Sequence, residues 1–169
     1  MTTDFRFQPA AVLFRKFFTG AKPLFLNLKP PLQCMNELNK TSILVAEDNE
    51  DGRLMVRVFL ENLGYRVIEA RNGREAVEMA KAFRPDLILM DLNMPELDGL
   101  SAVRCIRRFA ELAEIPILAN SADGMRGIDL FSDIKSFGPG YLEYIAKPLN
   151  LTTLADQIEI ALASVRQAA

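Results

Sequence analysis

From Thr41 onward the chain alternates short apolar runs with longer segments of helical periodicity, and this alternation restricts the fold more than any other feature. Continuous apolar runs of this kind are typical of strands that are buried on both faces of a parallel sheet. We predict strands at 43–46, 66–70, 86–90, 115–120 and 142–146. The intervening segments predict helices at about 50–62, 73–83, 99–109, 128–137 and 150–165.

The helical spacing also predicts which side chains face the core. In the first helix Leu54, Val58 and Leu63 are expected to be buried, with Gly64 ending the helix. In the segment 73–83 the residues expected on one face are Ala76, Val77, Ala80 and Phe83. In the last helix the expected stripe is Leu151, Leu154, Ile158, Ala161, Leu162 and Val165. Strands alternating with helices predict an α/β fold, a doubly wound (βα)5 parallel sheet with the flavodoxin-like strand order 2-1-3-4-5. In such a sheet the functional site lies beyond the carboxyl ends of the strands.

The absence of histidine limits the chemistry of this chain. It excludes Ser-His-Asp and Cys-His catalysis, histidine-ligated metals and a phosphohistidine on the chain itself. Any phosphoryl chemistry must therefore use a carboxylate. The two cysteines, Cys34 and Cys105, have neither a disulfide framework nor metal-ligand spacing, so we expect reduced thiols and a cytoplasmic setting.

Residues 1–40 differ in character from the rest. They are rich in phenylalanine and proline and hold six Lys/Arg against two acids, whereas the remainder is acidic. We interpret them as an irregular basic and aromatic extension, and 41–169 as the folded domain. We favour Met35 as the true start, and a membrane-surface segment is the alternative. The acidic body argues against nucleic-acid binding, and the longest apolar runs are too short for a membrane span.

Polar residues follow four of the predicted strands. Glu47 and Asp48 follow the first, Asp91 the third, Ser121 the fourth and Lys147 the fifth. Three carboxylates at one sheet edge repel one another and require a cation, and an all-oxygen ligand set favours Mg²⁺. Any single acid here could be a solvated strand end, but the set with a lysine and a hydroxyl indicates a site.

Four stretches carry a resemblance to a known family. They are ILVAEDN (43–49), LILMDLNMPELDG (87–99), IPILANSA (115–122) and YIAKP (144–148). Together they resemble the receiver domains of bacterial two-component response regulators, of the single-domain type found in chemotaxis regulators. The likeness spans about 43–165, and each motif falls at the end of the appropriate predicted strand.

The resemblance implies a role for each motif residue. Asp91 is the phosphoacceptor. Mg²⁺ is bound by Asp48, Asp91 and the backbone carbonyl of Asn93, with Glu47 acting through water. Lys147 and Ser121 contact the phosphoryl group.

The resemblance also implies a switch formed by Ser121 and Tyr144, in which the hydroxyl moves toward the phosphorylated aspartate and the tyrosine fills the space. A core role for Tyr144 is the alternative. The Lys147–Pro148 peptide is expected to be cis. Gly124 and Gly127 predict a late-starting fourth helix at the output surface.

The implied function is a phosphoacceptor signalling domain, not an enzyme. It would take its phosphoryl group from a sensor histidine kinase or a histidine phosphotransfer protein. Little sequence follows the last predicted helix, so we expect output by contact with a target protein, with phosphorylation-dependent dimerisation left open. A detached receiver of a hybrid kinase, acting in a phosphorelay, is an alternative. A haloacid-dehalogenase-type phosphohydrolase is disfavoured because Asn93 replaces its second aspartate, and the intact set disfavours a degenerate scaffold.

Overall fold

The structure is a computed structural model, and it describes residues 40–122, 140 and 142–168. The predicted helix at 128–137 and the extension before residue 40 lie outside the described residues. The elements are β1 (Ser42–Ala46), α2 (Glu50–Asn62), β2 (Arg66–Ala70), α3 (Gly73–Phe83), β3 (Leu87–Asp91), α4 (Gly99–Arg107), η2 (Ala110–Leu112), β4 (Ile117–Ser121), β5 (Leu142–Ala146) and α6 (Leu151–Ala168).

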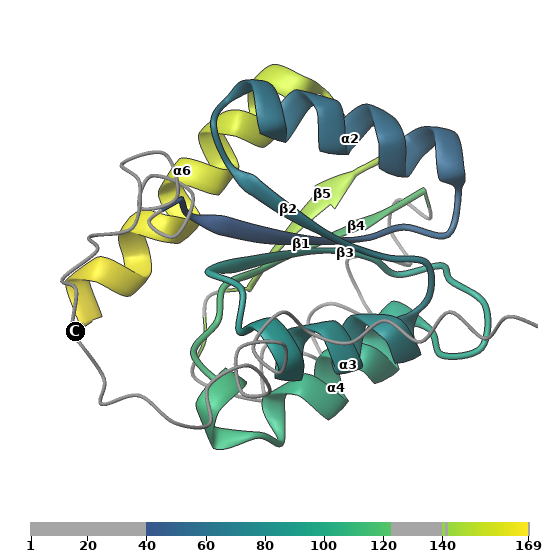
Figure 1. Cartoon of the computed structure of the whole chain (residues 1–169), viewed down its shortest axis with the longest axis vertical. Coiled ribbons are helices and arrows are strands. Elements are labelled where there is room, and N and C mark those ends of the chain that lie inside the picture. Colours follow the sequence, from purple (N-terminus) through teal and green to yellow (C-terminus); the bar gives the residue numbers. More distant parts are fainter. Residues whose placement is uncertain (1–39, 123–139, 141, 169) are drawn as a thin grey trace, which may run out of the picture.

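The five strands form one parallel sheet in the order β2-β1-β3-β4-β5. The predicted fold class and strand order are thereby confirmed. Helices α2 and α6 cover one face of the sheet and α3 and α4 cover the other (Figure 1). Because β1 and β3 lie inside the sheet, with a helix layer on each side, their residues are buried throughout.

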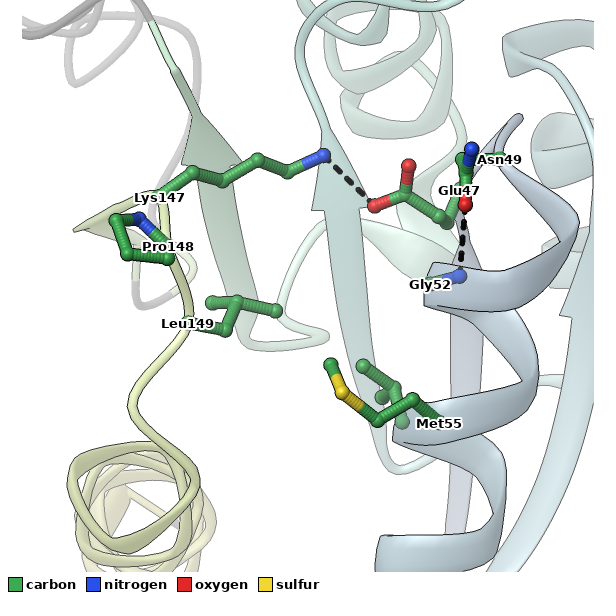
Figure 2. Close-up of a pocket in the computed structure, with 8 residues that line it drawn as sticks. Glu47, Asn49, Gly52, Met55, Lys147, Pro148 and Leu149 are labelled. Carbon is green, nitrogen blue, oxygen red and sulfur yellow. Dashed lines mark hydrogen bonds and ion pairs between the residues drawn. The ribbon is translucent and has the colours of Figure 1, made fainter.

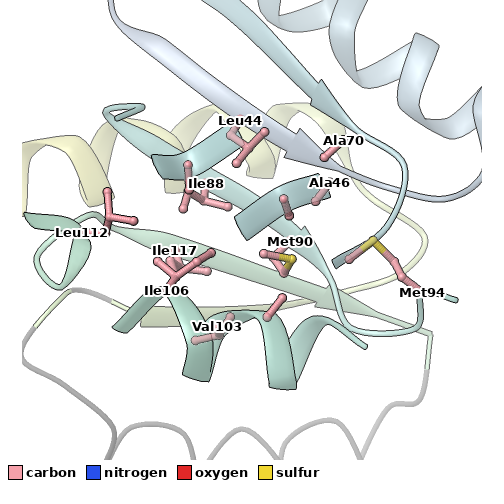
Figure 3. Packing of buried hydrophobic residues seen from close by; sticks show 13 residues of the cluster. Leu44, Ala46, Ala70, Ile88, Met90, Met94, Val103, Ile106, Leu112 and Ile117 are labelled. Carbon is pink, nitrogen blue, oxygen red and sulfur yellow. The ribbon is translucent and has the colours of Figure 1, made fainter. Parts of the chain in front are cut away.

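The core is divided by the sheet into two main clusters. On the α3 and α4 face, strand residues such as Leu44, Ile88 and Ile117 pack against Val103 and Ile106 of α4 (Figure 3). On the α2 and α6 face the buried cluster comprises Ile43, Val45, Val56, Leu60, Leu87, Leu89, Leu118, Ile145, Leu154, Ile158 and Ala161. Each large apolar side chain buried in this way stabilises the fold by roughly 1.5–3 kcal/mol.

Helices α2, α3, α4 and α6 each begin at a side-chain cap. In α6 the side-chain oxygen of Asn150 accepts hydrogen bonds from the backbone N–H groups of Thr152 and Thr153, at 3.0 and 3.2 Å. The side-chain oxygens of Asn49, Asn72 and Asp98 accept hydrogen bonds from the backbone N–H groups of Gly52, Glu75 and Ser101, each at 2.8 Å. Such caps satisfy backbone donors that a helix leaves unpaired and typically contribute about 1 kcal/mol. Each cap directly follows the loop from a strand end, so it fixes where those loops turn into helices.

Gly64 and Gly99 are among the positions of this framework that require glycine. Gly64 ends helix α2 with φ +91°, a left-handed conformation that other residues avoid. Gly99 begins α4 so close to β3 that a Cβ atom there would lie 2.0 Å from the carbonyl oxygen of Asp91. The loop after Asp91 is therefore held tightly against the start of α4.

The prediction of which residues of α2 face the core is wrong. Leu54, Val58 and Leu63 are 45%, 46% and 49% exposed, whereas Val56 and Leu60 are buried. The helix bounds themselves match the prediction. Apolar residues occur on both sides of this helix, so spacing alone did not identify the side that packs on the sheet.

Three smaller predictions also need adjustment. Strand β4 begins at Ile117, two residues later than predicted, and runs to Ser121. Helix α4 ends at Arg107, and the predicted remainder continues as turn and 3₁₀ structure. Phe83, at the end of α3, is half exposed.

Candidate functional site

The carboxyl ends of β1 and β3 bring three acids together. Glu47 and Asp48 follow β1, and Asp91 is the last residue of β3. One carboxylate oxygen from each residue lies within 4.8 Å of those of the other two. Glu47 and Asp91 are buried and Asp48 is exposed, so the cluster opens to solvent at one side.

Lys147 bridges two of these acids from the end of β5. Its Nζ lies 2.6 Å from Oδ2 of Asp91 and 2.8 Å from Oε2 of Glu47. Burial alone lowers the pKa of Lys147, but the hydrogen bonds to Asp91 and Glu47 outweigh burial and raise its pKa above the usual value. The lysine therefore stays charged and neutralises part of the cluster.

For Glu47, unlike Lys147, the surroundings favour the uncharged form. Burial raises its pKa, the hydrogen bond from Lys147 partly counteracts this, and the negative charge of Asp91 raises it further. The net result is a carboxyl group whose pKa lies above that of an ordinary glutamate. Ionised Glu47 is thus held at a cost, which a cation placed beside it would relieve.

The predicted polar partners also lie in this region. The side-chain amide of Asn93 donates to the Ser121 hydroxyl at 3.1 Å, and the Asn93 backbone N–H donates to Oδ1 of Asp91 at 2.9 Å. The hydroxyl of Tyr144 donates to the backbone carbonyl of Ser121 at 3.2 Å. The structure thus links Asp91, Asn93, Ser121 and Tyr144 in one chain of contacts.

Together these contacts place every site residue predicted from the sequence in one region beyond the strand ends. Their chemical roles stay predictions, because placement alone does not test them. The expected cis peptide between Lys147 and Pro148 is present.

Arg53 is part of this region and was missed by sequence reasoning. It is buried, although it lies in the first half of α2. Its Nη1 donates to the carbonyl oxygen of Glu47 at 2.8 Å, and its Nε lies 3.3 Å from Oε1 of Glu69 on β2. The guanidinium group thereby fixes the backbone that carries Glu47 and Asp48. An arginine in an otherwise amphipathic helix gives no sequence signal for this role.

A groove of about 250 Å³ opens beside the acids. Glu47 and Lys147 form its polar end, and Met55, Val56 and Leu149 contribute to its apolar lining. In Figure 2, Met55 of α2 and Leu149 of the loop after β5 lie on opposite sides of the groove. Met55 is 48% exposed and is accessible to a partner.

The donor set fits a hard divalent cation. Three carboxylate oxygens converge without a thiolate, and one of the residues is solvent-exposed, which leaves room for metal-bound water. Mg²⁺ prefers oxygen ligands and usually retains several waters. Glu47, Asp48 and Asp91 could therefore hold Mg²⁺.

The fold and these strand-end residues define a receiver-type α/β domain. Residues 43–159 match the family model described as the response regulator receiver domain. The chain belongs to this family.

Curated relatives and solved structures agree with this assignment. The chain is 37% identical over 119 residues to the polar-differentiation response regulator DivK of Brucella anthropi, covering 70% of this chain and 93% of DivK. It superposes with a TM-score of 0.65 on chemotaxis protein CheY4 of Vibrio cholerae, with 29% identity over 72% of this chain and 98% of CheY4.

A third similar protein is the receiver domain of a sensor histidine kinase from Pseudomonas aeruginosa. The TM-score is 0.65 and the identity 32%, over 73% of this chain and 98% of that domain. That structure has a magnesium ion coordinated in its active-site cleft. Among the described helices of the present chain, none combines the length and apolar character that a membrane span requires.

Proposed function

We propose that this chain is a cytoplasmic phosphoacceptor that receives a phosphoryl group on Asp91 from a phosphohistidine of a sensor kinase or a histidine phosphotransfer protein. The observation that carries the proposal is the convergence of Asp91 with Glu47, Asp48 and Lys147 at one sheet edge. A buried aspartate flanked by two acids and a lysine suits a phosphoryl acceptor, since cations can stabilise the charge that builds up there.

In the proposed step a carboxylate oxygen of Asp91 attacks phosphorus. The P–N bond to the donor imidazole breaks, its electron pair returns to the ring nitrogen, and an aspartyl phosphate forms. Asp48, Asp91 and the Asn93 carbonyl would hold Mg²⁺, with Glu47 acting through water, and the ion would supply charge neutralisation. Lys147 contributes a mobile cation to the phosphoryl oxygens, and the Ser121 hydroxyl donates a hydrogen bond.

The proposed switch starts from the contacts of Ser121. Its hydroxyl accepts from Asn93, and its backbone carbonyl accepts from Tyr144. A phosphoryl group on Asp91 offers the Ser121 hydroxyl a stronger, charged acceptor. Movement of Ser121 toward that group would alter the space beside Tyr144 and favour a second arrangement of the surface, which a target protein can select.

The groove beside the site is the proposed contact for the phosphohistidine donor. A donor that reaches Asp91 must approach the open end of the acid cluster, and the groove begins there with Glu47 and Lys147. Leu54, Met55 and Val58 are about half exposed on the adjoining part of α2. An apolar surface next to the reacting group fits a protein donor better than a small phosphate ester.

The proposal is tested by labelling the full chain with acetyl phosphate in the presence of Mg²⁺. We expect a slow, stoichiometric label that Asp91→Asn abolishes while the variant stays folded. Sustained turnover of small phosphomonoesters would indicate a hydrolase instead. A folded wild-type chain that takes no label, or an Asp91→Asn variant that labels equally well, would overturn the proposal.

A further inference from the structure

Asn120 is a polar residue in an apolar strand. It is 2% exposed and follows Ile117, Leu118 and Ala119, all fully buried, in β4. Its side-chain oxygen Oδ1 is buried and has no hydrogen-bond partner among the described residues. An acceptor that is buried without a partner destabilises the fold. A leucine or valine would avoid this cost, so the amide needs an explanation.

The strand register places Asn120 beside the phosphoacceptor. Asp91 on β3 is paired with Asn120, and Asn120 is paired with Ile145 on β5. Paired residues of a parallel sheet point to the same face, and side chains alternate along each strand. Two residues earlier, Leu89 and Leu118 belong to one cluster on the α2 and α6 face. Asp91 and Asn120 therefore point to that face side by side.

The Lys147 side chain must pass over β4, the strand that carries Asn120, to reach Asp91. It follows β5, yet its ammonium group contacts Asp91 on β3, and β4 lies between those strands. The Lys147 and Asp91 side chains, joined by their ion pair, thus together span two inter-strand spacings, roughly 9–10 Å. An ammonium group has three donor protons. Glu47 and Asp91 are the acceptors of two of them among the described residues.

We propose that Asn120 is a positioning residue for Lys147, whose side-chain oxygen accepts an ammonium proton when the lysine turns toward a phosphoryl group on Asp91. In that arrangement Lys147 leaves Glu47, and the amide oxygen beneath its path replaces the lost acceptor. The buried side-chain oxygen of Asn120 thus gains its hydrogen-bond partner when Asp91 is being phosphorylated. This inference rests on the proposed function and names a residue that supports it.

The test measures the initial rate of acetyl phosphate labelling at saturating Mg²⁺ for Asn120→Leu and Asn120→Ala in the full chain. Both remove the oxygen, one filling the space and one emptying it. We expect both to label roughly 10-fold more slowly, as for loss of a hydrogen bond to a charged group. The dissociation constant for Mg²⁺, measured by titration calorimetry, should change less than about two-fold. Leu118→Val, on the same strand and face, is the control for loosened packing and should label at the wild-type rate.

A double-mutant cycle separates positioning from a general structural effect. In a Lys147→Met background, replacing Asn120 should leave the remaining labelling rate unchanged, because the lysine through which it acts is gone. Equal slowing in that background overturns the inference, as does a wild-type rate for Asn120→Ala or an equal loss in Leu118→Val. If Asn120→Leu does not fold, Asn120→Ala decides. Failure of the wild type to label overturns the proposed function, which is a different outcome.

Discussion

Replacement of Lys147 by methionine tests how the acid cluster is held without metal. Methionine keeps much of the apolar stem and removes the charge that lies 2.6 Å from Asp91 and 2.8 Å from Glu47. Breaking a fully buried ion pair by removing one partner costs about 3–5 kcal/mol. The Lys147 side chain is 26% exposed, so water replaces part of its interaction. We therefore expect a loss of about 2 kcal/mol in the free energy of unfolding.

The same variant should respond more strongly to Mg²⁺. In the wild type, a cation that binds Glu47 and Asp91 must compete with the ammonium group of Lys147. If the ammonium group weakens the free energy of Mg²⁺ binding by about 1–2 kcal/mol, its removal lowers the dissociation constant for Mg²⁺ about 5–30-fold. Linkage then gives the variant about 1–2 kcal/mol more stabilisation than the wild type at saturating Mg²⁺. Most of the metal-free deficit should disappear.

Urea unfolding with and without Mg²⁺ measures both effects. The chain has no tryptophan, so far-ultraviolet circular dichroism is the appropriate signal. Lys81→Met is a matched control, because Lys81 is exposed and its Nζ lies over the ring of Phe109, 4.4 Å from the centroid. That control should lose less than about 1 kcal/mol and keep the wild-type response to Mg²⁺. Equal Mg²⁺ stabilisation of the wild type and Lys147→Met would refute the competition.

Three further predictions follow from single contacts. Gly99→Ala should lower the free energy of unfolding, measured in urea, by more than about 3 kcal/mol, because the new Cβ would lie 2.0 Å from the Asp91 carbonyl oxygen. Gly52→Ala, where the nearest contact of a Cβ is at 3.4 Å, is the control and should change that free energy by less than about 1 kcal/mol. Since burial raises the pKa of Glu47, Mg²⁺ affinity measured by calorimetry should start to fall, as the pH is lowered, at a higher pH than for an ordinary glutamate. Glu47→Gln should lose this part of the pH dependence, and an unchanged profile would contradict the assignment. Met55→Glu should slow phosphoryl transfer from a phosphohistidine donor by about 10-fold or more without slowing acetyl phosphate labelling. Leu63→Glu, equally exposed at the other end of α2, should slow neither reaction. Equal slowing of donor transfer by the two variants would argue against the groove as the donor contact.

The sheet could be predicted because its signals are local. Buried runs such as 87–90 are continuously apolar, and the acids, hydroxyl and lysine that end the strands needed only the parallel topology to meet. Strand β4 was placed too early because Ile115 is as apolar as the strand itself. Its carbonyl oxygen instead accepts a hydrogen bond from the buried guanidinium of Arg107, at 2.7 Å. That contact comes from the last residue of α4, eight residues earlier in the chain, and no apolar pattern in the sequence indicates it.

The error on α2 has a cause that also bears on function. Leu54 and Val58 have the same i,i+4 helical spacing as Val56 and Leu60, so periodicity fits either side. What selects the packed side is tertiary: Arg53 is fixed by the Glu47 carbonyl and Glu69, and this orients the helix on the sheet. Leu54 and Val58 then remain at the surface, and the exposed Met55 lines the groove that leads to Asp91. A helix that only packed would gain solubility from polar residues there. A helix that packs on the sheet and also contacts a partner needs apolar residues on two sides. The two-sided apolar pattern of α2, which made its buried face ambiguous, therefore agrees with its proposed role as a partner contact.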